Sequence, residues 1–170
     1  MSEIRSRVFF EGLVAGLIGY VTVAVVLGIV DLATGRSLFY TVATLGQAVF
    51  GGFDPAAGEV AVTPGHVFAY NGLHVLVFVG FGILVAWLVV ETELHPVIWY
   101  VAFMLLLGAF FLATLFAAGA GVALEGALPW WSVLLANVAA ALAMGTYLHR
   151  AHPRLLRTLR EHGDPELERG

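Results

Sequence analysis

Four long apolar runs, separated by short polar segments, dominate the pattern along the chain. They occupy residues 9–30, 65–90, 97–120 and 128–148. A helix needs about 20 mostly apolar residues to cross the hydrocarbon core of a bilayer, and each of the four runs is that long. We therefore predict an all-α integral membrane domain over residues 1–150. Its four spans are expected to form an antiparallel four-helix bundle, followed by a cytoplasmic tail over residues 151–170.

The long connection between the first two spans carries a shorter pattern. Leu38, Val42, Leu45 and Val49 recur at a helical period, which predicts a short helix over residues 38–50 with Ser37 or Thr41 as its N-cap. This helix is too short to span the membrane. The pattern fits both a helix that lies flat at the outer interface and one that re-enters the membrane.

The tail predicts another short helix. Pro153 stands at a favourable helix start, and Leu155, Leu156 and Leu159 are set among arginines. Such a basic amphipathic helix can rest on anionic headgroups or dock a cytosolic partner.

Composition supports a membrane protein and excludes several chemistries. The chain of 170 residues is 60% hydrophobic and only 12% charged, whereas soluble domains are typically about 25% charged. There is no cysteine, which removes disulfides and thiol chemistry, and the net charge of -4 argues against a nucleic-acid partner.

The placement of arginine predicts the orientation of the chain. All eight basic residues are arginines, and only Arg36 lies between the first and last spans. Cytoplasmic segments are enriched in positive charge, so both termini are expected on the cytoplasmic side of a bacterial inner membrane. Trp130 and Trp131 are then interface anchors at the outer surface.

Small residues in the first span predict close helix packing. Gly12 and Gly16 form a GxxxG pair, and Gly19 follows three residues later. Such a face lets a neighbouring helix approach the backbone closely. We expect partners in the same chain, in a second copy, or in a larger complex, with membrane lipid around them.

A few polar residues inside the spans form the one candidate site. Asn71 and His74 are three residues apart, so they share a helix face, and Tyr20 and Asn137 lie near the middle of the first and fourth spans. These four side chains could form a polar cluster that joins helices by hydrogen bonds. Alternatively, His74 and Asn71 could bind a small ligand such as a quinone or a haem. A bis-histidine haem within one protomer is not supported, because no other helix carries a membrane-embedded histidine.

Other polar groups do not form a recognisable catalytic or metal site. Glu91, Glu93 and His95 make an E-x-E-x-H turn, which we interpret as ordinary polar capping, and the candidate acids lie at opposite faces of the membrane. No metal site or enzymatic activity is expected.

The chain resembles small bacterial four-span proteins of uncharacterised function. The resemblance covers about the first 90 residues. It rests on the glycine-rich segment from Glu11 to Gly16, the Leu45-Gly46 pair, and a histidine near the outer end of the second span, here His74. It implies the same four-span layout and no particular activity. The sequence thus favours a non-enzymatic accessory or interaction subunit, with a ligand-binding protein centred on His74 as the alternative.

Overall fold

The computed structural model describes residues 2–51, 61–123 and 129–153, and every regular element in these ranges is helical. The helices are α1 (Ser2–Ala33), α2 (Tyr40–Phe50), α3 (Pro64–Leu94), α4 (Trp99–Ala123) and α5 (Trp130–Ala151), with a short 3-10 helix over Pro96–Ile98. The predicted all-α class is confirmed for these residues. Three helices, Arg5–Ala33, Pro64–Leu94 and Trp130–Ala151, are long and apolar enough to cross a membrane.

The helices extend beyond the apolar runs that predicted them. α1 begins at Ser2 instead of residue 9, α3 continues to Leu94, and α5 continues to Ala151. The apolar run marks the part of a helix that suits hydrocarbon, whereas polar residues at its ends can remain helical in water. The predicted tail helix after residue 153 and the start of the fourth run at residue 128 lie outside the described residues.

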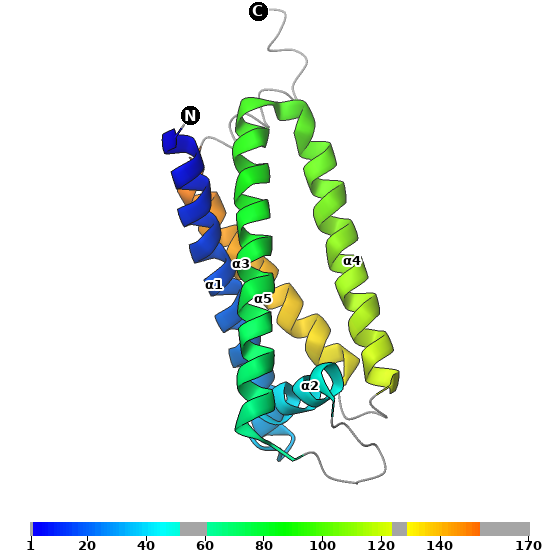
Figure 1. Cartoon of the computed structure of the whole chain (residues 1–170). Coiled ribbons are helices and arrows are strands. Elements are labelled where there is room, and N and C mark those ends of the chain that lie inside the picture. Colours follow the sequence, from blue (N-terminus) through cyan, green and yellow to red (C-terminus); the bar gives the residue numbers. More distant parts are fainter. Residues whose placement is uncertain (1, 52–60, 124–128, 154–170) are drawn as a thin grey trace, which may run out of the picture.

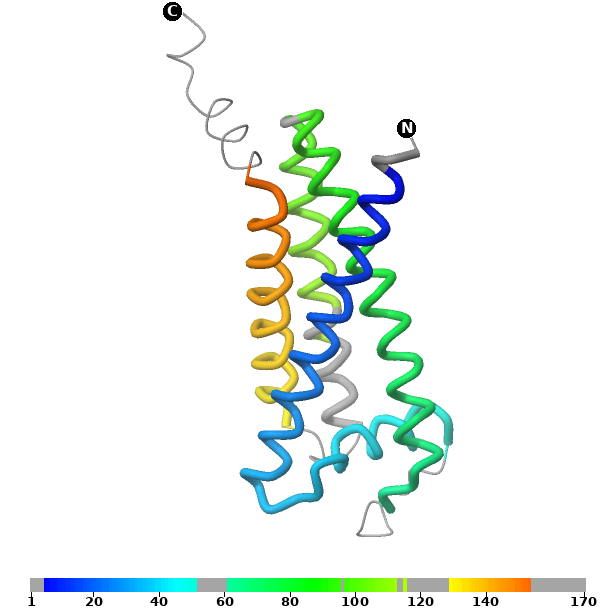
Figure 2. The backbone as a smooth tube through the Cα atoms, turned by 90° about the vertical axis from the view of Figure 1, so that its left-hand side faces the viewer, coloured from blue at the N-terminus to red at the C-terminus, as the bar shows by residue number. Residues whose placement is uncertain are grey.

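α1 packs against α3 through backbone surfaces, and the two helices are antiparallel (Figures 1 and 2). A methyl group added at Gly16 would lie 2.5 Å from the carbonyl oxygen of Phe78, and one added at Gly82 would overlap the backbone of Gly12. Gly12 itself faces the backbone of Ile83. Only glycine permits so close an approach, so this contact sets the spacing of the two helices.

α5 packs along α1 on another face and also runs antiparallel to it. Val23 and Leu27 of α1 form a buried cluster with Ala136 and Ala140 of α5. At the end that holds both the start of α1 and the end of α5, the Arg7 guanidinium donates to the carbonyl of Ala151 over 3.3 Å. α1 therefore lies between α3 and α5.

α4 stands apart from this three-helix core, as Figure 1 shows. Among its residues whose side chains are described, only Ala102 is buried. Phe103, Met104 and Leu105 are 49%, 59% and 57% exposed. Ala102 is buried and Leu106, Ala109 and Phe110 are partly buried, so the described part of α4 turns one narrow face to the core and exposes the rest. A compact bundle of four helices is not confirmed.

α2 lies across the far end of the core, against α3. Its buried residues are Thr41, Ala43, Thr44, Gly46 and Gln47, whereas Val49 and Phe50 are half exposed. The helix therefore buries its small and polar face and exposes apolar residues, the reverse of a surface helix on a soluble protein.

The start of α2 is capped differently from the prediction. The N-cap residue is Phe39, with no hydrogen bond from a side chain at that position, so the expectation of Ser37 or Thr41 as the cap is wrong. Instead the carboxylate of Asp31, at the end of α1, accepts hydrogen bonds from the backbone N–H of Thr41 (2.9 Å) and from its hydroxyl (2.7 Å). Sequence patterns detect a cap next to its helix, whereas this cap comes from ten residues away.

Candidate functional site

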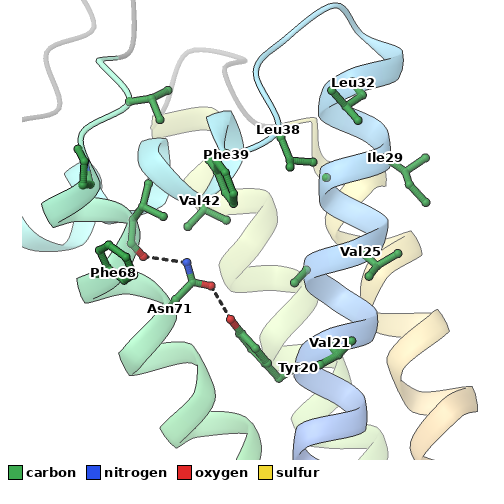
Figure 3. A pocket seen from close by; sticks show the side chains of 15 residues that line it. Tyr20, Val21, Val25, Ile29, Leu32, Leu38, Phe39, Val42, Phe68 and Asn71 are labelled. Atoms are coloured by element: carbon green, nitrogen blue, oxygen red, sulfur yellow. Dashed lines mark hydrogen bonds between the residues drawn. The ribbon is translucent and has the colours of Figure 1, made fainter.

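Tyr20, near the middle of α1, meets Asn71, about two turns from the start of α3. The Tyr20 hydroxyl donates to Asn71 Oδ1 over 2.8 Å, and Asn71 Nδ2 donates to the carbonyl of Val67 over 2.8 Å (Figure 3). The bond to Val67, one turn earlier on the same helix, fixes the amide of Asn71 so that its Oδ1 faces α1. The pair is thus a polar bridge between two otherwise apolar helices.

His74 lies next to this pair among aromatic rings. Its ring stacks on Phe78 with centroids 4.9 Å apart, and it makes edge contacts with Tyr70 at 5.2 Å and Tyr20 at 6.1 Å. No side-chain hydrogen bond of His74 is formed within the described ranges. Its position is therefore set by ring packing.

Asn137 does not join the other three polar residues. Within the part of the chain described, its side chain makes no hydrogen bond to Tyr20, Asn71 or His74. The structure thus brings together three of the four residues of the predicted cluster. Asn137 lies on α5 next to Ala136, which packs against Val23 and Leu27 of α1.

A cleft of about 810 Å³ lies between α1 and α3 and is bounded by α2 at one end (Figure 3). We call it the α1–α3 cleft. Its walls are almost entirely apolar, including Val25 and Ile29 of α1, Phe39 just before α2 and Phe68 of α3. Tyr20 and Asn71 lie at its inner end, whereas His74 is not among the residues that line it. Any ligand in this cleft would meet Asn71 before His74.

The remaining predicted residues take simple places in the fold. Trp130 and Trp131 begin α5 at the α2 end of the molecule and are 59% and 46% exposed. Gly12 and Gly16 lie at the contact with α3, and a methyl group at Gly19 would lie 2.5 Å from the sulfur of Met144 on α5. The three glycines therefore serve contacts within this chain.

At the end of the molecule away from α2 lies an ionic cluster that the sequence analysis did not predict. His152, only 1% exposed, places Nε2 2.7 Å from Glu11 of α1 and Nδ1 3.0 Å from Glu93 of α3. Arg7 Nε also donates to Glu11 over 2.8 Å. The cluster of Arg7, Glu11, Glu93 and His152 thus ties three helices together.

The sequence held a weak signal for this cluster. Glu11 interrupts the start of an apolar run, and an acid in that position calls for a partner. The E-x-E-x-H pattern predicts a polar turn for Glu93, whereas in the structure its carboxylate lies 3.0 Å from His152 Nδ1. The partner of Glu11 is His152, which directly follows α5. Nothing local in the sequence links these two residues.

The cluster is not arranged as a metal site. The two imidazole nitrogens point to different carboxylates, and no group of three His, Asp or Glu side chains in the described segments is placed to hold one ion. The haem or quinone at His74 stays a prediction.

Comparison with known proteins adds no relative. No family model, no curated protein and no solved structure matches this chain. The resemblance to small bacterial four-span proteins therefore stays a prediction, and function must be argued from the geometry.

Proposed function

We propose that this chain is a non-enzymatic, four-span protein of a bacterial inner membrane that acts as an accessory subunit, with α4 as its surface for another membrane helix. α1, α3, α4 and α5 are the spans, and both termini are cytoplasmic. The single observation that carries the proposal is the exposure of most of the described surface of α4, beside a core in which Gly12, Gly16 and Gly19 already meet helices of the same chain.

Burial supports the membrane setting. Large apolar side chains are exposed on every long helix, including Phe68 at 77%, Leu76 at 71% and Leu112 at 65%. A soluble protein exposing so continuous an apolar surface would aggregate, whereas in a bilayer that surface contacts lipid. The apolar outer face of α2 fits the same setting, in contact with lipid near the interface.

The distribution of charge supports the orientation. Arg5, Arg7 and Arg150 lie at the end of the molecule that holds the ionic cluster, and Arg36 lies at the other end. Positively charged residues favour the cytoplasmic side, so the ionic cluster is placed there and α2 with Trp130 and Trp131 on the outer side.

A photo-crosslinking amino acid in α4 tests the proposed partner surface. It is placed at Leu105 or Leu112, with Leu76 of α3 as a control of equal or greater exposure. In the host's own membranes we expect a protein adduct of discrete mass, either a second copy or one partner, from the α4 positions and not from Leu76. Only lipid adducts, or equal protein adducts from all three positions, would overturn α4 as the partner surface.

A further inference from the structure

One histidine fastens the end of α5 to two other helices. His152 directly follows α5, is 1% exposed, and places Nε2 2.7 Å from Glu11 of α1 and Nδ1 3.0 Å from Glu93 of α3. The imidazole therefore bridges two carboxylates through its two ring nitrogens. The protons on these nitrogens decide whether each contact attracts or repels.

The contact of Nε2 with Glu11 accounts for one proton. The carboxylate of Glu11 accepts from Arg7 Nε over 2.8 Å through Oε1 and faces His152 through Oε2. A guanidinium partner favours the ionised carboxylate, which can only accept hydrogen bonds. Nε2 therefore carries a hydrogen and donates it to Glu11.

The contact of Nδ1 with Glu93 requires a second proton. In a neutral imidazole with its hydrogen on Nε2, Nδ1 is an acceptor, and its lone pair would face a carboxylate oxygen at 3.0 Å. Nδ1 also has no aligned hydrogen-bond partner among the described residues, so the contact holds by charge rather than by a directed bond. Charge attracts Glu93 only when the imidazole of His152 is a cation.

The charges of the cluster balance only with that second proton. Glu11 and Glu93 are acids and Arg7 is a cation, so an imidazolium at His152 makes the cluster neutral. A neutral imidazole would leave one carboxylate uncompensated beside a side chain closed to water, which is costly. Within the described residues, the other charged or titratable groups at this end form no ion pair with the cluster: Arg5, Glu91, His95, His149 and Arg150.

Glu93 gives the buried imidazole a route to water. Its side chain is 21% exposed, against 1% for that of His152. The Nδ1 proton can therefore leave past Glu93 to water or hydroxide at this end of the molecule. Its loss sets the Nδ1 lone pair against the carboxylate of Glu93, whereas the Nε2 hydrogen still serves Glu11. Deprotonation thus loosens α5 from α3 and leaves its contact with α1.

We propose that His152 and Glu93 form a proton-operated clasp between α5 and α3. The clasp is closed while both ring nitrogens of His152 carry hydrogen, and it opens when the Nδ1 proton is lost. Pro153, the next residue, is exposed, so the clasp sets how firmly the start of the following segment is anchored. The proposal does not depend on the role of α4.

Nitrogen NMR of the full chain, labelled at histidine and held in detergent micelles, reports the protonation directly. The signals of His152 are identified by their loss in His152→Gln. At about pH 7 we expect both ring nitrogens of His152 to show the protonated signature in the wild type. Glu93→Gln removes the charge beside Nδ1 and keeps the size of the side chain, so Nδ1 should lose its hydrogen in that variant.

Spin labels on paired cysteines measure the clasp itself, because the chain has no native cysteine. Leu94→Cys with His149→Cys reports the separation of α3 and α5 at the clasp, where both residues are exposed. Phe68→Cys with Trp130→Cys reports it at the α2 end and serves as the control pair. Between about pH 6 and about pH 9, the distance distribution of the first pair should about double in width, and that of the control pair should stay narrow.

Two variants decide whether the clasp causes this response. With Glu93→Gln or His152→Gln added, the width for the first pair should no longer change with pH, and a narrow control pair shows that the variant is folded. The proposal is overturned if His152 of the wild type is neutral at about pH 7, or if the first pair does not respond to pH. It is also overturned if the response persists in folded Glu93→Gln. None of these results bears on crosslinking at α4, so the two proposals fail separately.

Discussion

The imidazole of His152, at the end of α5, lies 2.7 Å from the carboxylate of Glu11, nine residues into α1. The same carboxylate accepts from Arg7, and the other imidazole nitrogen faces Glu93. Three helices that are distant in sequence are thus joined at one end by charged groups, while glycine contacts join them in the middle. A buried imidazole between two acids is stable only while those partners remain in place.

Removal of Glu11 is expected to destabilise this end of the molecule. Glu11→Ala leaves His152 with one of its two acidic neighbours, which should cost about 1–3 kcal/mol of unfolding free energy. Glu91→Ala removes the same charge from a side chain without such contacts. Chemical unfolding in detergent measures both variants, and an equal effect of the two would contradict a structural role for the cluster.

Asp31 is expected to hold α2 in place. Its side chain is 1% exposed and accepts both hydrogen bonds from Thr41. Asp31→Ala removes this remote cap and should speed amide hydrogen exchange over residues 40–50, with a loss of about 0.5–2 kcal/mol typical of lost caps. Ser37→Ala, at the position that the sequence suggested as a cap, should change exchange little. Faster exchange in Ser37→Ala than in Asp31→Ala would refute this assignment.

Substitution by alanine is expected to change stability in opposite directions at two nearby glycines of α3. A methyl group at Gly82 meets the backbone of α1, whereas nothing lies within 4 Å of one added at Gly80. Gly82→Ala should therefore separate the helices and cost about 1–3 kcal/mol. Gly80→Ala should be neutral or slightly stabilising, because alanine favours helices. Thermal unfolding of the two variants is the measurement, and similar midpoints would argue against the close contact.

The Tyr20–Asn71 hydrogen bond is expected to contribute modestly. Tyr20→Phe removes it without a change of shape, and hydrogen bonds between membrane helices average about 0.6 kcal/mol. Tyr70→Phe serves as the control, because the Tyr70 hydroxyl has no hydrogen bond among the described residues. If the unfolding free energy of Tyr70→Phe falls as much as that of Tyr20→Phe, the bond has no special role.

The helices themselves could be predicted because membrane insertion depends on local properties. An apolar run of sufficient length is visible without knowledge of any neighbour, and so is the GxxxG pair of Gly12 and Gly16. Gly82, which faces this pair, could not be recognised from the sequence. Its role depends on the two helices being antiparallel and in register.

Long-range polar pairs escaped prediction for the same reason. Asn71 and Tyr20 were expected to be near one another only as members of a loose cluster, and Asn137 was included although it lies elsewhere. The hydrogen bonds that Thr41 donates to Asp31, and the contact between His152 and Glu11, depend on how helix ends meet in space. Helical periodicity says which face a residue occupies, but not which end of another helix reaches it.

The most direct test of the membrane layout uses the absence of cysteine from the chain. Single cysteines at Ser2, Ala57 and Gly170 can be labelled with a membrane-impermeant maleimide in intact cells and after lysis. The proposed layout predicts labelling of Ala57→Cys from outside, with Ser2→Cys and Gly170→Cys labelled only after lysis. Labelling of either terminus in intact cells, or protection of Ala57→Cys, would contradict four spans with both termini in the cytoplasm.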